Sequence, residues 1–267
     1  MSKEKLRDIH EGRKEFFRSA KSTFIENWPR TLCQLSIAQT KVQLSLDETV
    51  AFETYIKNVW NSIEQRQPIP EAAIYDTLAE RISDAMQLLK CPTGWFIRLG
   101  SRSPKDSYLF HDKKGRCGSE HDALAMLTCM SERVVEDLWD AINMDYPVSI
   151  FVRQWLDIAP WTEFRCFMKN RKLIGVSQYQ YHDTFAGLPK LIDSIRWAIE
   201  IFFEQFRIAS HLDDVIFDVF VRRHGPMHET TWEVKLLEIN PFGAFTDPCL
   251  FDWRDMNSFD GSTLIRS

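Results

Sequence analysis

The sequence predicts an α+β fold with mostly antiparallel sheets, preceded by a helical N-terminal region. Over residues 1–92 apolar side chains recur mainly at helical spacing, and from Trp95 onward short strand-like runs are mixed with helices. Tight turns separate several of these runs, and no regular alternation of strand and helix is visible, which favours antiparallel pairing. We therefore expect a helical region over 1–92 and a mixed region over 93–267.

Each expected element rests on periodicity and on the residues that interrupt it. The expected helices cover residues 3–25, 47–63, 71–89, 121–130, 132–143 and 189–210. The expected strands cover residues 94–99, 107–110, 148–155, 163–168, 172–180, 215–222 and 231–239. Ser45 or Asp47 is the expected N-cap of the second helix. Asn170-Arg171 is expected to turn one hairpin, and His224-Gly225-Pro226 the last one.

The composition is typical of a globular protein, with 44% hydrophobic and 27% charged residues. The net charge of −5 argues against a surface that binds nucleic acid everywhere, while a local basic cleft stays open. The six cysteines form no CxxC pair, so we expect reduced thiols in a cytoplasmic protein. No apolar run is long enough for a membrane helix, and no P-loop or dinucleotide motif occurs.

Three oxygen-bearing side chains lie within apolar runs near the C-terminus. Asp218 lies inside one run, and Glu238 and Asn240 lie two residues apart in the next, so they share a face of a strand. Burying such groups is costly unless something pairs with them. Their oxygens suit Mg²⁺. The alternative is that each is a hydrogen-bonded polar residue of a strand end, and the spacing alone does not decide between the two.

Several cations could bind an anion. Arg165 shares a strand face with Glu163, so it either pairs with that glutamate or binds phosphate with its planar guanidinium. Arg98, alone on an apolar strand, either extends to solvent or reaches a phosphate. The loop 101–106, which contains Lys105, either closes over an anion or is an ordinary surface loop.

Taken in order, these segments resemble the cell division cycle protein 123 family. The segments that carry the resemblance are Arg98-Leu99, Ser103-Pro104-Lys105-Asp106, Val152-Arg153-Gln154-Trp155, Glu163-Phe164-Arg165-Cys166-Phe167, residues 172–178, Phe217-Asp218-Val219, residues 238–243, Thr246-Asp247 and residues 250–253. The resemblance runs from about residue 95 to residue 253. Residues 1–90 do not match the start of the family.

The family is similar in fold to ATP-grasp enzymes, in which two α+β lobes hold ATP and Mg²⁺ in the cleft between them. The resemblance implies Asp218, Glu238 and Asn240 as metal ligands, although the family often has Asp where this chain has Glu238. It implies contacts to ATP from the following residues: Arg98, Lys105, Val152, Arg153, Gln154, Trp155, Arg165 and Gln178. Val152 to Trp155 would read the adenine edge through backbone groups. Arg98 and Arg165 would stabilise the transferred phosphate.

The resemblance leaves three functions open. The first, which we expect, is an ATP-dependent ligase of the ATP-grasp class that activates an acid or a phosphate end, with RNA or protein as substrate. The second is an ATP-binding assembly chaperone for translation initiation factor 2 that binds the gamma subunit without turnover. The third is a degenerate fold with a structural ion-pair network. A basic cleft of Arg98, Arg102, Lys105, Arg153 and Arg165 would serve RNA or ATP alone.

Overall fold

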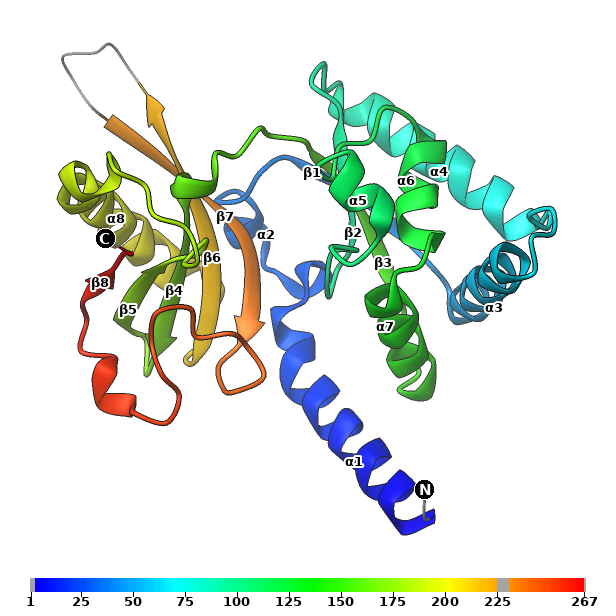
Figure 1. Cartoon of the computed structure of the whole chain (residues 1–267), viewed down its shortest axis with the longest axis horizontal. Helices are drawn as coiled ribbons and strands as arrows, with labels where there is room; N and C mark the ends of the chain where they lie inside the picture. The colour runs from blue at the N-terminus through cyan, green and yellow to red at the C-terminus, as the bar shows by residue number, and fades with distance from the viewer. Residues whose placement is uncertain (1–2, 225–230, 267) are drawn as a thin grey trace. The chain divides into compact units, whose positions relative to one another are not determined.

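The computed structural model describes residues 3–224 and 231–266 (Figure 1). Contacts along the chain group it into two compact units, the first made of residues 1–21 and 38–156 and the second of residues 22–37 and 157–267. This grouping differs from the division at residue 92 expected from the sequence. Residues 38–92 belong with the strands that follow them, because a strand in this stretch pairs with one near residue 150.

The first unit is built on a three-stranded antiparallel sheet. Its strands β1 (Gln39–Gln43), β2 (Trp95–Leu99) and β3 (Ser149–Gln154) run in the order β1-β3-β2. One face carries Ile97, Ile150 and Val152, each at most 1% exposed. The sequence analysis did not predict β1, because Gln39–Gln43 contains one buried apolar residue and therefore no visible alternation.

Helices make up most of the rest of this unit. They are α1 (Lys3–Ala20), α3 (Leu46–Glu64), α4 (Ala73–Leu89), α5 (Tyr108–Asp112), α6 (Glu120–Thr128) and α7 (Glu132–Asn143). Of these, α4 and α6 contact the sheet. Ser45 caps α3 in a reciprocal capping box with Glu48, which confirms the expected N-cap. The strand expected at 107–110 is wrong, because Ser107 begins a helical turn there. Its hydroxyl donates to the carbonyl of Cys129, and its own carbonyl accepts from the amide of Phe110.

The second unit contains a five-stranded sheet in the order β7-β6-β4-β5-β8. Its strands are β4 (Glu163–Lys169), β5 (Lys172–Gln178), β6 (Val215–His224), β7 (Thr231–Pro241) and β8 (Thr263–Leu264). All neighbours pair antiparallel except β5 and β8, which are parallel. Gly225 and Pro226 of the expected last turn lie outside the described residues.

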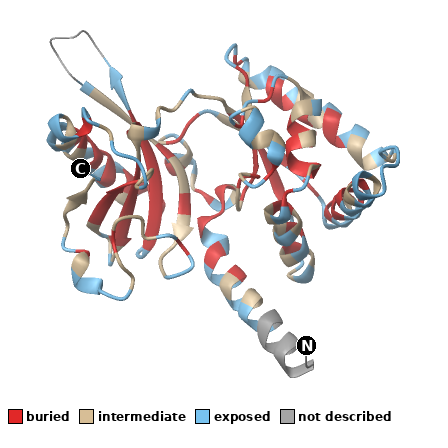
Figure 2. Cartoon of the chain, viewed as in Figure 1, coloured by how far each residue is buried: buried red, intermediate tan, exposed pale blue. Residues whose placement is uncertain are grey.

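Helix α8 (Ile192–Ser210) covers one face of this sheet (Figure 1). Phe206 of α8 stacks on Phe217 of β6 with ring centroids 4.2 Å apart. Residues 215–221 of β6 are all buried, as the red segment of this strand in Figure 2 shows. The helical stripe of buried residues on α8 packs on one face of this strand.

The opposite face is partly covered by the segment that follows β7. Phe251 and Phe259 pack on Phe167 of β4 with ring centroids 5.2 and 5.0 Å away. Gly175 of β5 allows this approach, because an added Cβ would lie 2.6 Å from the Phe251 ring. The C-terminal segment therefore forms a small aromatic core of its own on the sheet.

The N-terminal part of the second unit consists of short turns and α2 (Arg30–Cys33), which contacts α8. Ser36 forms a bridge to Leu236 of β7, and its hydroxyl donates to the Leu236 carbonyl at 2.7 Å. The amide of Leu236 donates to the carbonyl of Leu35. The segment 22–37, which lies between the two parts of the first unit in the sequence, is therefore tied to a strand 200 residues later in the chain.

Within the described residues, none of the helices has the length and apolar character needed to cross a bilayer. The cytoplasmic location expected from the cysteines stays a prediction.

Candidate functional site

Three adjacent strands of the second unit bring charged residues into one row. Arg165 of β4 lies opposite Asp218 of β6, and Asp218 lies opposite Glu238 of β7. Residues directly opposite each other in an antiparallel pair point to the same face. Asn240 lies two residues beyond Glu238 on that face, and a bulge after Asp218 shifts the register so that Leu237 has no direct partner.

Arg165 and Asp218 form a bidentate ion pair. The Nε and Nη2 atoms of Arg165 each donate at 2.8 Å, one to each carboxylate oxygen of Asp218. The Asp218 side chain is 0% exposed and that of Arg165 is 6% exposed. Burial lowers the pKa of Arg165, but the charge and hydrogen bonds of Asp218 raise it by more, so the net shift is upward and both groups are charged.

The remaining contacts of Arg165 come from two loops. Its Nη1 donates at 2.8 Å to the carbonyl oxygen of Asp247, and its guanidinium lies 4.8 Å from the ring centroid of Tyr179. Tyr181 donates to the Asp247 carboxylate at 3.0 Å, which holds this loop in place. Arg165 therefore makes three hydrogen bonds to protein groups, and it pairs with Asp218, whereas Glu163 was the acid named in the sequence analysis.

Glu238 and Asn240 are adjacent to this pair. The Nδ2 atom of Asn240 lies 3.5 Å from an oxygen of Asp218 and 3.4 Å from an oxygen of Glu238. The Asn240 amide thus lies within hydrogen-bonding reach of both carboxylates as a donor.

The metal-binding character expected from the sequence is not supported by the structure, while the individual ligand roles of Asp218, Glu238 and Asn240 stay predictions. Among residues 3–224 and 231–266, no three or more His, Cys, Asp and Glu side chains gather so that they could hold a metal ion. Both oxygens of Asp218 already accept bonds from a guanidinium, whose positive charge opposes a cation beside it. The sequence indicates that a buried Asp218 needs a partner, and Arg165 is that partner.

The thiols near the ion pair are protonated at neutral pH. Burial raises the pKa of Cys249 to about 12, with Arg165 acting in the opposite direction. Burial also raises the pKa of Cys166, on the opposite face of β4, well above its usual range. Because the thiolate is the reactive form, neither cysteine is poised as a nucleophile.

Gln178 has a structural position at the end of β5. Its Nε2 donates to the carbonyls of Gln180 and Asp183, and its Oε1 accepts from the amide of Arg266 at 3.2 Å. The side chain is fully buried. A contact to ATP is not tested by these bonds and stays a prediction.

The other expected nucleotide contacts belong to the first unit. Arg98 of β2 and Arg153 of β3 are buried on the same face of the three-stranded sheet, since Arg98 lies opposite Phe151. Arg98 donates to the carbonyls of Leu99 and Ser101 at 3.0 and 3.1 Å. Lys105 lies in the loop between β2 and α5. Phosphate contacts from these side chains stay predictions.

The backbone of the expected adenine-reading strand takes part in the sheet. β3 is the central strand, so Val152 and Arg153 have partners on both sides. The amides of Gln154 and Trp155 donate to the carbonyls of Ala38 and Gly94 at 2.9 and 3.1 Å. These two N–H groups are therefore engaged within the protein, and a role in reading adenine stays a prediction.

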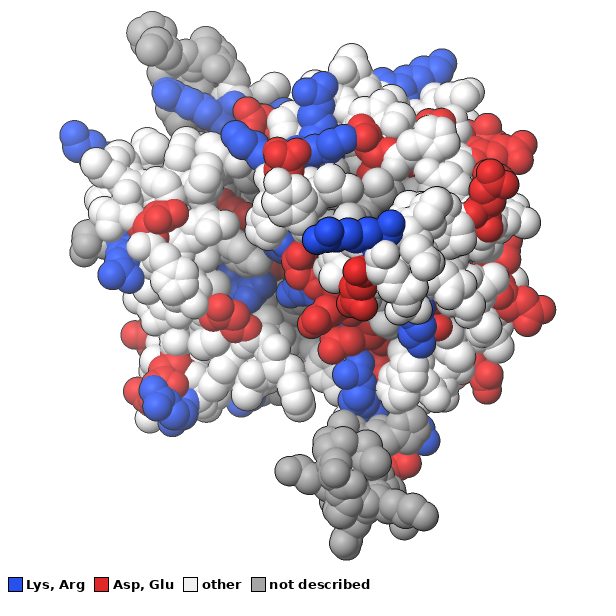
Figure 3. Space-filling view, turned by 45° about the vertical axis from the view of Figure 1, so that its right-hand side comes forward, with Lys and Arg blue, Asp and Glu red and all other residues white. Residues whose placement is uncertain are grey.

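Two of the cations expected to form the basic cleft for RNA are paired with acidic side chains. Arg102 donates to Asp137 at 2.9 Å and to Glu136 at 3.1 Å, and Arg165 is paired with Asp218. On the face seen in Figure 3, basic and acidic side chains lie among one another, and neither sign covers the face alone. This distribution gives little of the continuous positive surface that phosphate backbones need.

Tyr179 was missed by the sequence analysis. It follows Gln178, and only the register shows that it lies beside Arg165, because Ser177 is the residue opposite Arg165 on β5. Counting two residues on from Ser177 would have placed Tyr179 on the Arg165 face, but this requires the pairing to be known.

The family model described as D123 matches residues 35–264. This chain belongs to the D123 family. The match begins well before residue 95, so the expectation that residues 1–90 do not fit the family is wrong from residue 35 onward.

The curated relatives that this chain matches are similar to it over only part of their length. A protein named "Translation initiation factor eIF2 assembly protein" from Xenopus laevis is 29% identical over 171 residues, which cover 60% of this chain and 48% of that protein. "Cell division cycle protein 123" from Phaeosphaeria nodorum is 31% identical over 161 residues, which cover 60% of this chain and 38% of that protein. The matches thus span about half of these relatives or less.

A solved structure shares the fold. The structure of Cdc123 from Schizosaccharomyces pombe matches with a TM-score of 0.70 and 21% identity, covering 92% of each chain. An α+β fold of this family is therefore confirmed, with its antiparallel pairing and the one parallel pair between β5 and β8.

The comparisons also correct the expected activity. The names of the relatives describe assembly of a translation initiation factor, and this overturns the expectation of an ATP-dependent ligase, including an RNA ligase.

Proposed function

We propose that this chain is an assembly protein for translation initiation factor 2 and acts by binding a subunit of that factor. The observation that carries the proposal is the family match over residues 35–264, in a family whose curated relatives include eIF2 assembly proteins of Xenopus laevis and Xenopus tropicalis. These relatives match over about half their length, so the partner is carried over as a proposal.

The chemistry of the Arg165 site supports a binding role. Arg165 and Asp218 neutralise each other, and the neighbouring Cys249 and Cys166 hold their protons. Such a site fixes three strands and two loops in place but presents no activated group to a substrate. A rigid second unit is what a protein that holds a partner requires.

The test is binding to the separately purified subunits of translation initiation factor 2. We expect the whole chain to co-elute with the gamma subunit in size-exclusion chromatography and to raise the yield of assembled factor. A different subunit of the factor, tested alone at the same concentration, is the control. A chain that neither binds the gamma subunit nor changes the assembly yield would contradict the proposal.

The finer fold assignment and the nucleotide belong to the same proposal. The resemblance to ATP-grasp proteins supports ATP as a ligand, with Arg98, Lys105 and residues 152–155 among the contacts. Calorimetric titration of the whole chain with ATP tests this part, with GTP as the control nucleotide. Absence of heat at millimolar ATP would remove ATP from the proposal and leave the assembly role to be judged by the subunit experiment.

A further inference from the structure

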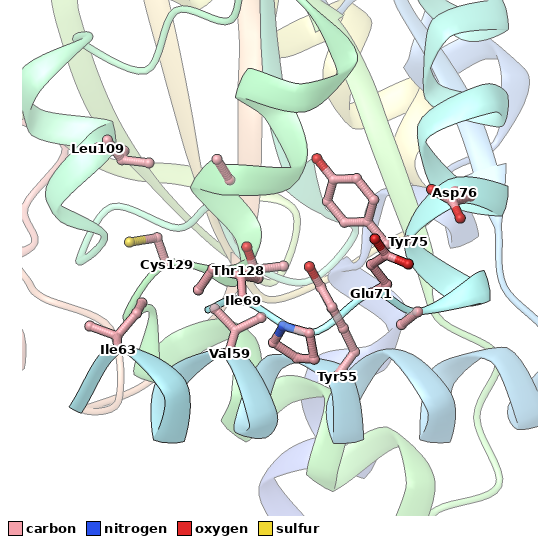
Figure 4. A pocket seen from close by; sticks show the side chains of 13 residues that line it. Tyr55, Val59, Ile63, Ile69, Glu71, Tyr75, Asp76, Leu109, Thr128 and Cys129 are labelled. Carbon is pink, nitrogen blue, oxygen red and sulfur yellow. The ribbon is translucent and has the colours of Figure 1, made fainter. Parts of the chain in front are cut away.

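A pocket of about 660 Å³ lies in the first unit, away from Arg98 and β3. Its thirteen lining residues come from α3, the 69–72 segment, α4, α5 and α6 with its end (Figure 4). From α3 it takes Tyr55, Val59 and Ile63, four residues apart. At 1.5 Å per residue these positions span about 12 Å, the length of two helical turns of a bound segment.

One end of the pocket is apolar and open. Figure 4 shows Ile63, Leu109 and Cys129 at this end, with Val59 and Ile69 between the ends. Ile63 and Ile69 are 41% and 49% exposed, although both are large aliphatic side chains. Covering them would remove apolar surface from water, which favours an apolar occupant.

The other end is polar and acidic. Glu71, Tyr75 and Asp76 lie there (Figure 4), and the Tyr75 hydroxyl is hydrogen-bonded to Nδ1 of His121 at 2.9 Å. The two rings are parallel, with centroids 5.9 Å apart. This bond and stacking fix Tyr75 as a preformed wall of the pocket.

The electrostatic field at this end is negative. Burial and the charge of Asp76 raise the pKa of both Tyr55 and Tyr75, and Glu120 adds to the effect on Tyr75. The lining contains Glu71 and Asp76 but no lysine or arginine. A bound phosphate or anionic membrane would meet two carboxylates without a compensating cation, whereas an ammonium or guanidinium group would be attracted.

We propose that this pocket binds a peptide segment of a partner protein that presents an apolar side chain and, about one helical turn away, a lysine or arginine. The apolar side chain would cover Ile63 and Ile69, and the cation would lie between Glu71, Asp76 and the phenol of Tyr55. This arrangement is the helix-in-groove mode, with anchors three or four residues apart. The inference goes beyond the assembly role and stands without it.

The test uses synthetic peptides and the whole chain. The probe is a fluorescent peptide in which leucine and lysine recur at helical spacing. Two companions replace either every leucine by serine or every lysine by glutamate. We expect the leucine–lysine peptide alone to bind in fluorescence anisotropy and its affinity to fall as salt is raised. No binding of this peptide at millimolar protein, or equal binding of all three, would overturn the proposal.

Variants locate the binding. Ile69→Ser and the double variant Glu71→Gln/Asp76→Asn should each weaken the leucine–lysine peptide about three- to tenfold. Their matched controls are Leu88→Ser, at an aliphatic residue of α4 that is 73% exposed, and Glu80→Gln, at an exposed acid of the same helix; neither residue lines the pocket.

Since Ile69, Glu71 and Asp76 are themselves exposed, the variants should keep the thermal midpoint of the parent chain. Equal loss of affinity in the controls would place the binding elsewhere and reject this site. A failure here with normal binding to the gamma subunit would leave the proposed assembly role untouched.

Discussion

Arg165 and Asp218 meet across adjacent strands with two hydrogen bonds of 2.8 Å and almost no exposure to water. The pair joins β4 to β6 on the face that also carries Glu238. Removing one member leaves the other charge buried without its partner, which is far more costly than removing both.

The first prediction follows from this pairing. Asp218→Ala should lower the free energy of unfolding by about 3–5 kcal/mol, because the guanidinium of Arg165 would remain buried. The apolar double variant Arg165→Met/Asp218→Leu should recover most of this loss. Urea unfolding of the parent chain, Asp218→Ala and the double variant measures these free energies. A double variant as unstable as Asp218→Ala would show that loss of the ion pair is not the cause.

The second prediction concerns the close approach of Gly175 to Phe251. Gly175→Ala places a methyl group where the Phe251 ring now lies, 2.6 Å from its nearest carbon, so the unfolding free energy should fall by about 1–3 kcal/mol. Gly187→Ala is the control, since nothing lies within 4 Å of its added Cβ. Adding Phe251→Leu to Gly175→Ala should restore part of the loss. Equal thermal midpoints for Gly175→Ala and Gly187→Ala would contradict the packing argument.

The third prediction concerns acid stability. The amide of Ser45 lowers the pKa of Glu48 below its usual 4.5, and Arg81, which donates at 2.9 Å, lowers it further. Ionised Glu48 therefore stabilises the fold above the pKa of the unfolded chain, and this contribution is lost as the pH falls through the lower folded pKa.

Glu48→Gln should therefore cost about 0.2–1 kcal/mol at neutral pH and nothing well below the pKa of Glu48, where the parent carboxyl is protonated too. Thermal midpoints of both chains across this pH range measure the difference. Glu80→Gln, at an exposed acid of α4, is the control, and its thermal midpoint should follow that of the parent chain across the same range.

The fourth prediction concerns Cys249. Because its pKa is raised to about 12 by burial, the thiolate is scarce at mildly alkaline pH, and alkylation by iodoacetamide should be at least tenfold slower than in the unfolded chain. Peptide mass spectrometry follows Cys249 separately from the other cysteines. The same reaction in guanidinium chloride is the control. Rapid alkylation of Cys249 in the folded protein would show that Arg165 governs its pKa more than burial does.

Much of the fold was readable from the sequence because local signals agreed with tertiary packing. The apolar periods located α3, α4, α7 and α8 closely, and the Ser45 cap was visible as Ser three residues before Glu. β1 and β8 were missed because neither is long enough or apolar enough to alternate visibly. The helix at Tyr108–Asp112 was taken for a strand because its first turn depends on the hydrogen bond from Ser107 to Cys129, which is distant in sequence.

The site was readable only in part. The sequence marked Asp218, Glu238, Asn240 and Arg165 as polar residues in apolar strands that need partners. It could not show that two of them satisfy each other, because the partner of Asp218 lies 53 positions away and depends on strand register. The buried Asp218 can therefore be recognised as half of an ion pair only once the pairing of β4 with β6 is known, because the sequence alone is equally compatible with a metal ligand.

The bridge between Ser36 and Leu236 has a consequence for synthesis of the chain on the ribosome. The segment 22–37 leaves the ribosome early, yet the strand that it joins follows some 200 residues later. The first unit, whose contacts lie among residues 1–21 and 38–156, can fold before the partner strand of the segment 22–37 has been synthesised. The second unit closes only after β7 has been made, so its half-built sheet is the stage at which the nascent protein most needs protection from other chains.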